Sequence, residues 1–435
     1  MHYFSTNRRS PGVTFREAVL RGQPDDEGLY FPSSLPAVSA EFLKSLHDRA
    51  NGDIAFKVIQ PFVGGCIPDD PLREICEETV DFDFPLVSIT EDIWTLELFH
   101  GPTLAFKDVG ARFMSRCLRY FAGDREKKTL VIVATSGDTG GAVAHGFHNV
   151  EGTEVVILYP KGRVSEVQKL QLTTLGGNVT TLEIRGSFDD CQAIAKRALA
   201  DTDLQENAYI TSANSINVAR WLPQQFFYFF AIKQWLALGF TESPIFSVPS
   251  GNFGNLASGV LAMTSGLPVR RFIAACNAND VIPEFFRTGE YRRRASVATL
   301  SNAMDVGDPS NFVRILELFG GDAAELKKCI SAVSISDERT VKTIRDVHCN
   351  YGYLLDPHGA VAFAALEDHL MKDQGRQGIF LETAHPVKFD SAAEILGVET
   401  EVPRSVSELF QKESSVIELG VDYGSVREII MERTK

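Results

Sequence analysis

Residues 129–148 read TLVIVATSGDTGGAVAHGFH, and this stretch decides the fold class. It opens with a nearly uninterrupted apolar run from Thr129 to Ala134, continues through a turn rich in glycine and hydroxyl side chains, and takes on helical spacing from Gly141. A strand that is buried on both faces loses the usual alternation of polar and apolar side chains. The stretch therefore predicts a parallel strand that leads through a tight turn into a helix.

The same arrangement recurs further along the chain. Apolar runs predict strands at residues 154–158, 178–184, 245–248, 271–276 and 379–381, and helical patterns stand at residues 165–175 and 189–201. Strands that alternate with helices are typical of an α/β fold, here a doubly wound one with parallel strands. Ligands in such folds bind beyond the carboxyl ends of the strands, so the loops at those ends are the candidate sites.

Length and composition place the chain among ordinary globular proteins. Its 435 residues suggest two or three domains, and 44% hydrophobic with 23% charged residues exclude the disordered, collagen-like and coiled-coil classes. Lysine and arginine number 43 against 57 acidic residues, which gives a net charge of −14. This acidic balance argues against a nucleic-acid partner and leaves room for a local basic pocket that binds one small anion.

The cysteines and the apolar segments indicate a reducing compartment and no membrane partner. Seven cysteines include no C-x-x-C pair, so neither a disulfide framework nor a metal site is expected. No apolar segment follows Arg8 and Arg9, which argues against a signal peptide. Residues 226–238 are the most apolar stretch but are too short to span a bilayer, so they predict a buried helix. We expect a soluble, cytoplasmic protein.

Two glycine-rich loops follow predicted strands and are candidate anion sites. The first, PSGNFGN at residues 249–255, lets the backbone turn its N–H groups toward one point at the start of a helix, which suits a phosphate or a carboxylate. The second, TSGDTG at residues 135–140, could bind a carboxylate. The alternatives are a plain tight turn for the first loop and a helix N-cap for the second.

Lys107 lies in the stretch LFHGPTLAFKD at residues 98–108, where a helical pattern begins among apolar neighbours. Most lysines in such a setting extend their amine to solvent. A lysine that is desolvated near a helix N-terminus instead favours its neutral amine, which can form a Schiff base. Both interpretations are open from the residues alone.

Two further loops carry polar groups. The segment SANSINVAR at residues 212–220 offers Asn214, Ser215, Asn217 and Arg220, of which the arginine presents a planar fork for phosphate. Thr383 follows the last predicted strand and could donate to a ring nitrogen. A capped helix start and an ordinary strand end are the alternatives. Taken together, a lysine, two anion cradles, this cluster and a late hydroxyl fit pyridoxal phosphate and an anionic amino-acid substrate.

Several long stretches resemble threonine synthases. They are LFHGPTLAFKDVGARF at 98–113, ATSGDTGGAVAH at 134–145, SANSIN at 212–217, VPSGNFGN at 248–255, TLSNAMDVGDPSN at 299–311 and ETAHPVKF at 382–389. The resemblance covers nearly the whole chain. It implies a tryptophan-synthase-β-like (fold type II) pyridoxal phosphate enzyme with two open, mostly parallel sheets and flanking helices. It also implies an N-terminal module at 1–88, a small α/β domain at 89–215 and a large cofactor-binding domain at 216–435.

The resemblance also implies residue roles. Lys107 would be the catalytic residue and would bind the cofactor covalently. The phosphate of the cofactor would lie on Gly251, Asn252, Phe253, Gly254 and Asn255, and Thr383 would face its ring nitrogen. The substrate would be bound by Ser136, Gly137, Asp138, Thr139, Lys161, Ser215, Asn217 and Arg220.

The implied reaction converts O-phospho-L-homoserine and water into L-threonine and phosphate. Lys107 would remove the α-proton, loss of a β-proton would expel the γ-phosphate, and water would add at Cβ. The partner would thus be a small molecule, and the chain would be a monomer or a homodimer. Alternatives are a phospho-amino-acid lyase or a serine/threonine dehydratase on the same fold, and a non-catalytic binder of phosphate or nucleotide.

Overall fold

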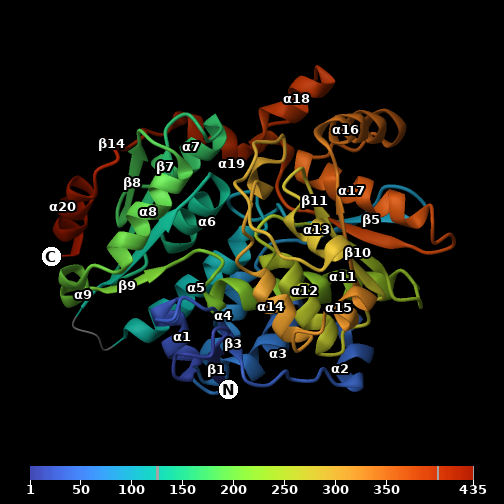
Figure 1. Ribbon diagram of the computed structural model, residues 1–435, viewed down its shortest axis with the longest axis horizontal. Helices are drawn as coiled ribbons and strands as arrows, with labels where there is room; N and C mark the ends of the chain where they lie inside the picture. The colour runs from blue at the N-terminus through green and yellow to red at the C-terminus, as the bar shows by residue number, and fades with distance from the viewer. Residues whose placement is uncertain (124–126, 399–400, 435) are drawn as a thin grey trace.

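The computed structural model describes residues 1–123, 127–398 and 401–434. It contains two mostly parallel sheets above a smaller N-terminal module (Figure 1). In the described residues, the larger sheet has the strand order β12-β11-β10-β13-β5-β4. Neighbouring strands of this sheet pair in parallel, except that β4 runs antiparallel to β5 at one edge. The strands are β4 (Leu86–Ser88), β5 (Ile93–Glu97), β10 (Ile245–Pro249), β11 (Arg271–Cys276), β12 (Ile330–Ser334) and β13 (Gly378–Glu382).

The second sheet lies on the left in Figure 1 and is parallel throughout the part of the chain that the structure describes. Its order is β14-β8-β7-β6-β9. The strands are β6 (Thr129–Ala134), β7 (Thr153–Pro160), β8 (Val179–Ile184), β9 (Tyr209–Ser212) and β14 (Ile417–Leu419). Every residue of β6 and β8 is buried, which is why these strands read as continuous runs rather than as alternating patterns.

Helices cover both faces of the sheets, as a doubly wound fold requires. Between the first strands and the end of β9 they are α5 (Lys107–Ala122), α6 (Asp138–Phe147), α7 (Glu166–Thr173), α8 (Phe188–Leu199) and α9 (Thr202–Asn207). After β9 come α10 (Val218–Trp221), η2 (Leu222–Gln224), α11 (Gln225–Ala237), α12 (Gly254–Thr264), α13 (Val281–Thr288), η3 (Asn302–Met304), α14 (Phe312–Leu318) and α15 (Ala323–Cys329). The chain ends with α16 (Asp337–Tyr351), α17 (Pro357–Leu370), η4 (Pro386–Lys388), α18 (Asp390–Leu396), α19 (Arg404–Ser407), η5 (Leu409–Gln411) and α20 (Tyr423–Thr434).

The N-terminal module contains both a sheet and helices. It has a small antiparallel sheet in the order β2-β1-β3, built from β1 (His2–Ser5), β2 (Val13–Thr14) and β3 (Tyr30–Pro32). It also has the helices α1 (Phe15–Arg21), α2 (Ala40–Lys44), η1 (Leu46–Asp48), α3 (Asn51–Val63) and α4 (Asp69–Thr79). Buried apolar side chains of α3 join it to the rest of the molecule, so it shares the main core rather than forming a separate one.

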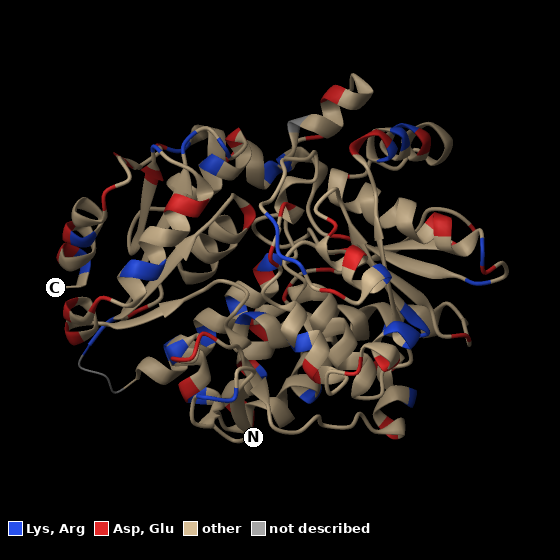
Figure 2. Ribbon diagram, in the orientation of Figure 1, with Lys and Arg blue, Asp and Glu red and all other residues tan. Residues whose placement is uncertain are grey.

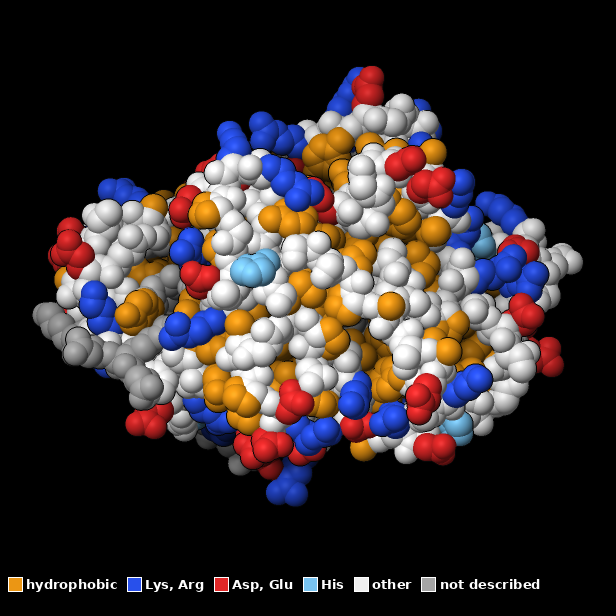
Figure 3. Space-filling model, turned by 90° about the horizontal axis from the view of Figure 1, so that it is seen from below, with side chains coloured by type: hydrophobic (Ala, Val, Ile, Leu, Met, Phe, Trp, Pro, Cys, Tyr) orange, Lys and Arg blue, Asp and Glu red, His pale blue; other side chains and the backbone are white. Residues whose placement is uncertain are grey.

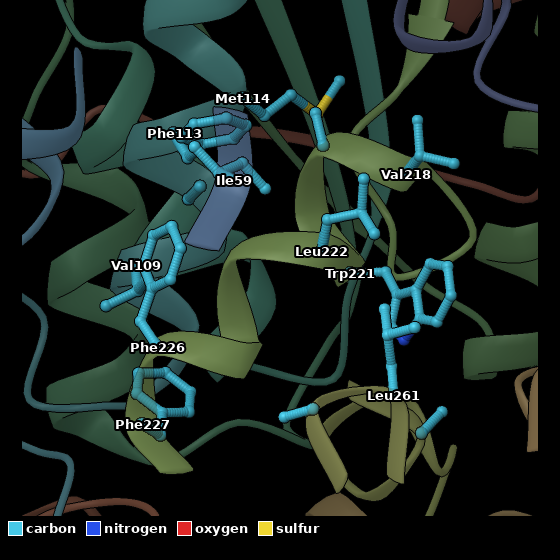
Figure 4. Close-up of a cluster of buried hydrophobic side chains, with 14 of the residues drawn as sticks. Ile59, Val109, Phe113, Met114, Val218, Trp221, Leu222, Phe226, Phe227 and Leu261 are labelled. Carbon is cyan, nitrogen blue, oxygen red and sulfur yellow. The ribbon is translucent and has the colours of Figure 1, made fainter. Parts of the chain in front are cut away.

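A cluster of buried apolar side chains joins the module to both sheets (Figure 4). Ile59 comes from α3, Phe113 from α5, and Phe226 from α11, and all three have almost no exposed surface. Helix α11 is buried along most of its length, as the apolar run at 226–238 predicted. This shared core holds the starts of α5, α10 and α12 in fixed positions, and these are the elements that carry the candidate site.

The sequence-based fold class is confirmed, with all six predicted strands present within a few residues of their expected ends. The strand pairing, however, crosses the expected boundary at 215/216. Strand β5 pairs with β13 in the larger sheet, and the C-terminal β14 pairs with β8 in the smaller one. Parallel pairing depends on topology rather than on chain order, so contiguous segments do not describe the sheets. The boundaries 1–88, 89–215 and 216–435 stay predictions.

The surface carries charges of both signs. Figure 2 shows basic and acidic residues spread over both lobes and in the central region between the two sheets. Seen from below, basic, acidic and apolar side chains are interspersed (Figure 3). None of the helices in the described residues is long and apolar enough to cross a membrane.

Helix α12 packs against α11 through Gly259, and this contact gives a test of the fold. A Cβ added at Gly259 would lie 2.4 Å from Cζ of the buried Tyr228. We expect Gly259→Ala to lower the free energy of unfolding by about 1–3 kcal/mol, because overpacking forces neighbours out of place. Chemical denaturation measures this. Gly424→Ala in α20 is the matched helical control, because its added Cβ would meet only ordinary contacts, at 3.4 Å or more. Equal stability of the two variants would contradict the packing.

Candidate active site

Lys107 is the first residue of α5 and follows the loop that leaves β5. The backbone of this loop is tied to the segment after β13, where the Phe106 N–H donates to the Thr383 carbonyl at 2.9 Å and Ala105 pairs with Ala384. Because β13 also pairs with β10, the loops after β5, β13 and β10 leave one edge of the sheet side by side. The structure thus brings three of the predicted site loops to one edge.

The Lys107 amine lies in a largely buried, charged setting. Its side chain is 18% exposed, and its Nζ atom is 3.6 Å from Oδ2 of Asp138. Burial lowers the pKa of Lys107 below its ordinary value, Asp138 acts in the opposite direction, and the positive charges of Lys388 and Arg220 lower it further. The neutral amine, which is the form that attacks an aldehyde, is therefore more accessible than in an exposed lysine.

Asp138 is the first residue of α6, which follows strand β6 of the smaller sheet. Its carboxylate contacts side chains from segments of both sheets. Its Oδ1 lies 2.8 Å from the Lys388 amine and accepts a hydrogen bond from Gln168 Nε2 at 2.9 Å. Burial acts against ionisation, but the charges of Lys388 and Lys107 outweigh it and hold the pKa of Asp138 well below its usual value. The sequence reasoning missed Lys388, although it stands in the quoted motif ETAHPVKF; its signal was a lysine two residues after a proline turn.

The turn before α6 is held by Thr135, another residue that the sequence reasoning passed over. Its hydroxyl accepts from the N–H groups of Gly137 at 3.0 Å and Gly140 at 2.8 Å. Gly137 has φ 139°, and a Cβ there would lie 2.5 Å from Gln168. Of the predicted residues in this loop, Ser136 is exposed and Thr139 is half-buried. Asp138 is buried and contacts Lys107.

The loop 251–255 connects β10 to α12 and has the form of an anion cradle. Phe253 has left-handed backbone (φ 63°) directly before α12 begins at Gly254. Among the described residues, no atom accepts a hydrogen bond from the N–H groups of residues 251–253, and the buried Nδ2 of Asn255 is likewise without a partner. Such a set of free donors at a helix N-terminus fits a phosphate.

The cradle and the segment 212–220 are joined directly by hydrogen bonds. Asn252 Nδ2 donates to Ser215 Oγ at 2.7 Å, while Asn252 Oδ1 accepts from the N–H and the hydroxyl of Ser310. Asn311 Nδ2 also donates to Ser215 Oγ, at 3.2 Å. Segments from three separate parts of the chain therefore meet at Ser215.

Arg220 lies in α10 with 3% of its surface exposed. Its guanidinium donates to the Ala213 carbonyl, and its Nε has no partner in the part of the chain that the structure describes. Burial lowers the pKa of Arg220 to about 10, and the negative charge of Asp108 offsets this only in part. A buried cation that forms no ion pair with a described carboxylate costs free energy, so this position favours an incoming anion.

Two predicted substrate ligands have other partners in this structure. Asn217 caps α10, with its Oδ1 accepting from the Ala219 N–H and its Nδ2 donating to the Val19 carbonyl, so its amide is already bonded to backbone. Lys161 is 49% exposed at the end of β7 and lies 2.6 Å from Glu418 and 3.8 Å from Glu183. Here Asn217 supports its loop, and Lys161 pairs with carboxylates beside the edge strand β14, so their roles as substrate ligands stay predictions.

Comparisons with known proteins agree along the whole chain. Residues 85–381 match the family model described as "Pyridoxal-phosphate dependent enzyme", residues 2–80 match "Threonine synthase N terminus", and residues 359–430 match "Threonine synthase, C-terminal". Threonine synthase from Escherichia coli is 41% identical over 432 residues, which is 99% of each chain.

Solved structures give the same result. The crystal structure of the Escherichia coli threonine synthase has a TM-score of 0.91 at 40% identity and covers 99% of this chain and 100% of that one. A pyridoxal-phosphate-bound threonine synthase from Brucella melitensis has a TM-score of 0.93 at 35% identity, with 100% of both chains covered. Maize serine racemase, at 17% identity and a TM-score of 0.57 over 75% of this chain and 95% of that one, shares the fold.

The Asn252–Ser215 hydrogen bond gives a test of the assembled site. We expect Asn252→Ala and Ser215→Ala each to lower the free energy of unfolding by about 1–2 kcal/mol, because each removal leaves polar partners unpaired. The double variant should lose less than the sum, by about 0.5–1 kcal/mol. Denaturant titration of all four proteins measures this coupling. Strict additivity would show that the two loops do not meet.

Proposed function

This chain belongs to the threonine synthase family of pyridoxal-phosphate-dependent enzymes, and from that premise we propose that it converts O-phospho-L-homoserine and water into L-threonine and phosphate. It is a pyridoxal-phosphate-dependent lyase of that family. The observation that carries the choice of substrate is Arg220, a buried guanidinium that forms no ion pair with any carboxylate the structure describes. Its positive charge also lowers the pKa of the nearby Lys107 amine.

The residues present fit the cofactor. Lys107 supplies a buried amine of lowered pKa, the turn 251–255 supplies free N–H donors at the start of α12, and Thr383 lies at the end of β13 between the two. We propose that these residues bind the aldehyde, the phosphate and the ring nitrogen respectively. When bound, pyridoxal phosphate supplies a conjugated ring that accepts the electron pair left by removal of a proton next to the amino group.

Lys107 moves the proton. Its Nζ atom, once free, takes the α-proton of the substrate, because burial and two neighbouring cations favour the unprotonated amine. Asp138, at 3.6 Å, faces the same atom and stabilises the ammonium after the transfer. Nothing in this step requires a group from solvent, which agrees with the largely buried side chain.

Arg220 receives the leaving phosphate. A fixed cation in a site sheltered from water stabilises developing negative charge without reorganisation. Ser215, two residues before Asn217 on the same segment, adds a hydroxyl whose oxygen already accepts from Asn252 and Asn311, so its proton is free to be donated. We propose that these two residues bind the phosphate of the substrate.

The second candidate is a serine/threonine dehydratase or a related phospho-amino-acid lyase. The structural likeness to a threonine deaminase, at 15% identity, shows the shared fold alone. A dehydratase acts on an uncharged hydroxyl and needs no cation at Arg220. Incubation with O-phospho-L-homoserine separates the alternatives: threonine and phosphate in equal amounts support the proposal, and 2-oxobutyrate as the main product overturns it.

The finer predictions on partners and location are part of the same proposal. We propose that the substrate is this one small molecule, that the chain acts as a monomer or homodimer in the cytoplasm, and that no nucleic acid is involved. The net charge of −14 supports the absence of a nucleic-acid partner, and cysteines without a C-x-x-C pair support a reducing compartment.

Lys107→Ala tests the covalent attachment. The variant should stay folded, because the side chain is at the edge of the core, yet it should lose the visible absorbance of the bound cofactor and essentially all turnover. Absorbance spectra, circular dichroism and a threonine assay measure the three properties. Lys169→Ala, a half-exposed lysine of α7, is the control and should keep all three. Retained turnover in the Lys107 variant would end the proposal.

Arg220→Gln tests the phosphate site. Loss of a charged hydrogen bond of about 1.5–3 kcal/mol should lower kcat/KM for O-phospho-L-homoserine roughly 10- to 100-fold. Inhibition by inorganic phosphate should weaken in parallel, while the absorbance of the bound cofactor stays. Arg220→Lys keeps the positive charge but not the planar guanidinium. Its kcat/KM and its inhibition by phosphate should lie between those of the parent protein and of Arg220→Gln. An unchanged response to phosphate would place the leaving group elsewhere.

A further inference from the structure

Lys388 is a fully buried lysine that the proposed reaction does not use. Its side chain has 0% of its surface exposed, and its amine donates to the Thr103 carbonyl at 2.8 Å and lies 2.8 Å from Asp138. A buried ammonium is costly unless it is paired and hydrogen-bonded, so a cation at this position needs a reason. The two carboxylate oxygens of Asp138, its partner, supply that reason.

The Asp138 carboxylate is shared unequally between two lysines. Its Oδ1 is occupied by Lys388 and by Gln168 Nε2, whereas its Oδ2 faces the Lys107 amine at the longer distance of 3.6 Å. Asp138 begins α6 beside the smaller sheet, and both lysines follow strands of the larger sheet. The carboxylate therefore lies between the lobes, with its charge already balanced from the Lys388 side.

Removal of Lys388 would leave Asp138 with Lys107 as its nearest cation. A buried carboxylate that loses one positive partner gains most from the other in its charged form. Lys107 would then be held as an ammonium, which cannot attack an aldehyde or accept a proton. The second lysine thus protects the reactivity of the first.

We propose that Lys388 is a positioning residue that neutralises Asp138 across the interface between the two sheets and so keeps the Lys107 amine unprotonated and reactive. The inference rests on the proposed function in one respect, namely that Lys107 is the lysine that binds the cofactor. Other charged groups face this set. Arg220 adds to the positive field at Lys107, while the buried Asp108, on α5 itself, accepts from Thr103 and is subject to the charges of Lys388 and Arg112.

The test measures the Lys107 amine directly in the full-length protein after removal of the cofactor. Trace acetylation with acetic anhydride over a series of pH values, followed by mass spectrometry of the peptide that contains Lys107, reports the fraction of free amine. That fraction rises as pH increases through the pKa of the lysine. An exposed lysine such as Lys342 in the same sample is the internal reference.

We expect Lys388→Met to shift the Lys107 profile to higher pH by one unit or more, so that acetylation at pH 8 is at least tenfold slower. In Lys388→Arg, the rate of Lys107 acetylation at pH 8 should stay within about threefold of the rate in the parent protein, since arginine keeps the charge beside Asp138. The double variant Lys388→Met/Asp138→Asn should regain fast acetylation, because the carboxylate that would trap the ammonium is gone. Lys169→Met is the matched control and should change nothing.

Two outcomes would overturn the inference. One is a Lys388→Met profile equal to that of the parent; the other is a slowed profile that Asp138→Asn does not rescue, since that would show only structural damage. If Lys388→Met does not fold, Asp138→Asn alone decides: it should shift the Lys107 profile to lower pH, and no shift would contradict the proposal. Borohydride reduction with pyridoxal phosphate separately shows which lysine binds the cofactor, so failure of the proposed function is distinguishable.

Discussion

The position of β13 between β10 and β5 is the constraint on which the site depends. Parallel pairing on both sides of β13 brings the carboxyl ends of strands that begin at residues 93, 245 and 378 to one edge of the sheet. The amine of Lys107, the glycine turn at 251–255 and Thr383 follow directly. No local property of these loops would bring them together without that pairing, because nearly 300 residues separate the first from the last.

The interface between the two sheets adds a second constraint, since it buries charge. Lys107 and Lys388 come from the larger sheet and Asp138 from the smaller one. Separation of the lobes would expose these groups to water. Their packing keeps the charged groups in a low dielectric, where they interact more strongly. The contact between Gln171 and the Thr103 carbonyl, at 3.0 Å, joins the same elements. The packing of the two lobes therefore sets the electrostatic environment of the amine.

The sequence predicted the strands and the apolar setting of Lys107 better than the partners of that lysine. Buried parallel strands such as β6 are recognisable because both faces are apolar, and Lys107 stands out among apolar neighbours. Lys388 could not be singled out, because its partner Asp138 is 250 residues away and the contact exists only in the assembled fold. Lys161 and Asn217 show a second limit of the sequence, since it could not reveal that Lys161 pairs with Glu418 and that Asn217 caps α10.

The N-terminal module explains why the segment 212–220 is rigid enough to hold an anion. Arg314 of α14 donates to the carbonyls of Ser215 and Ile216 and to that of Tyr30 in β3, and its guanidinium lies 4.3 Å above the Trp221 ring. The ring of Trp221 in turn stacks on Phe31 at 5.8 Å. A buried cation that is satisfied by backbone carbonyls fixes those carbonyls in place. The module thus contributes no atom to the proposed chemistry, yet it fixes the segment from which Ser215 and Arg220 act.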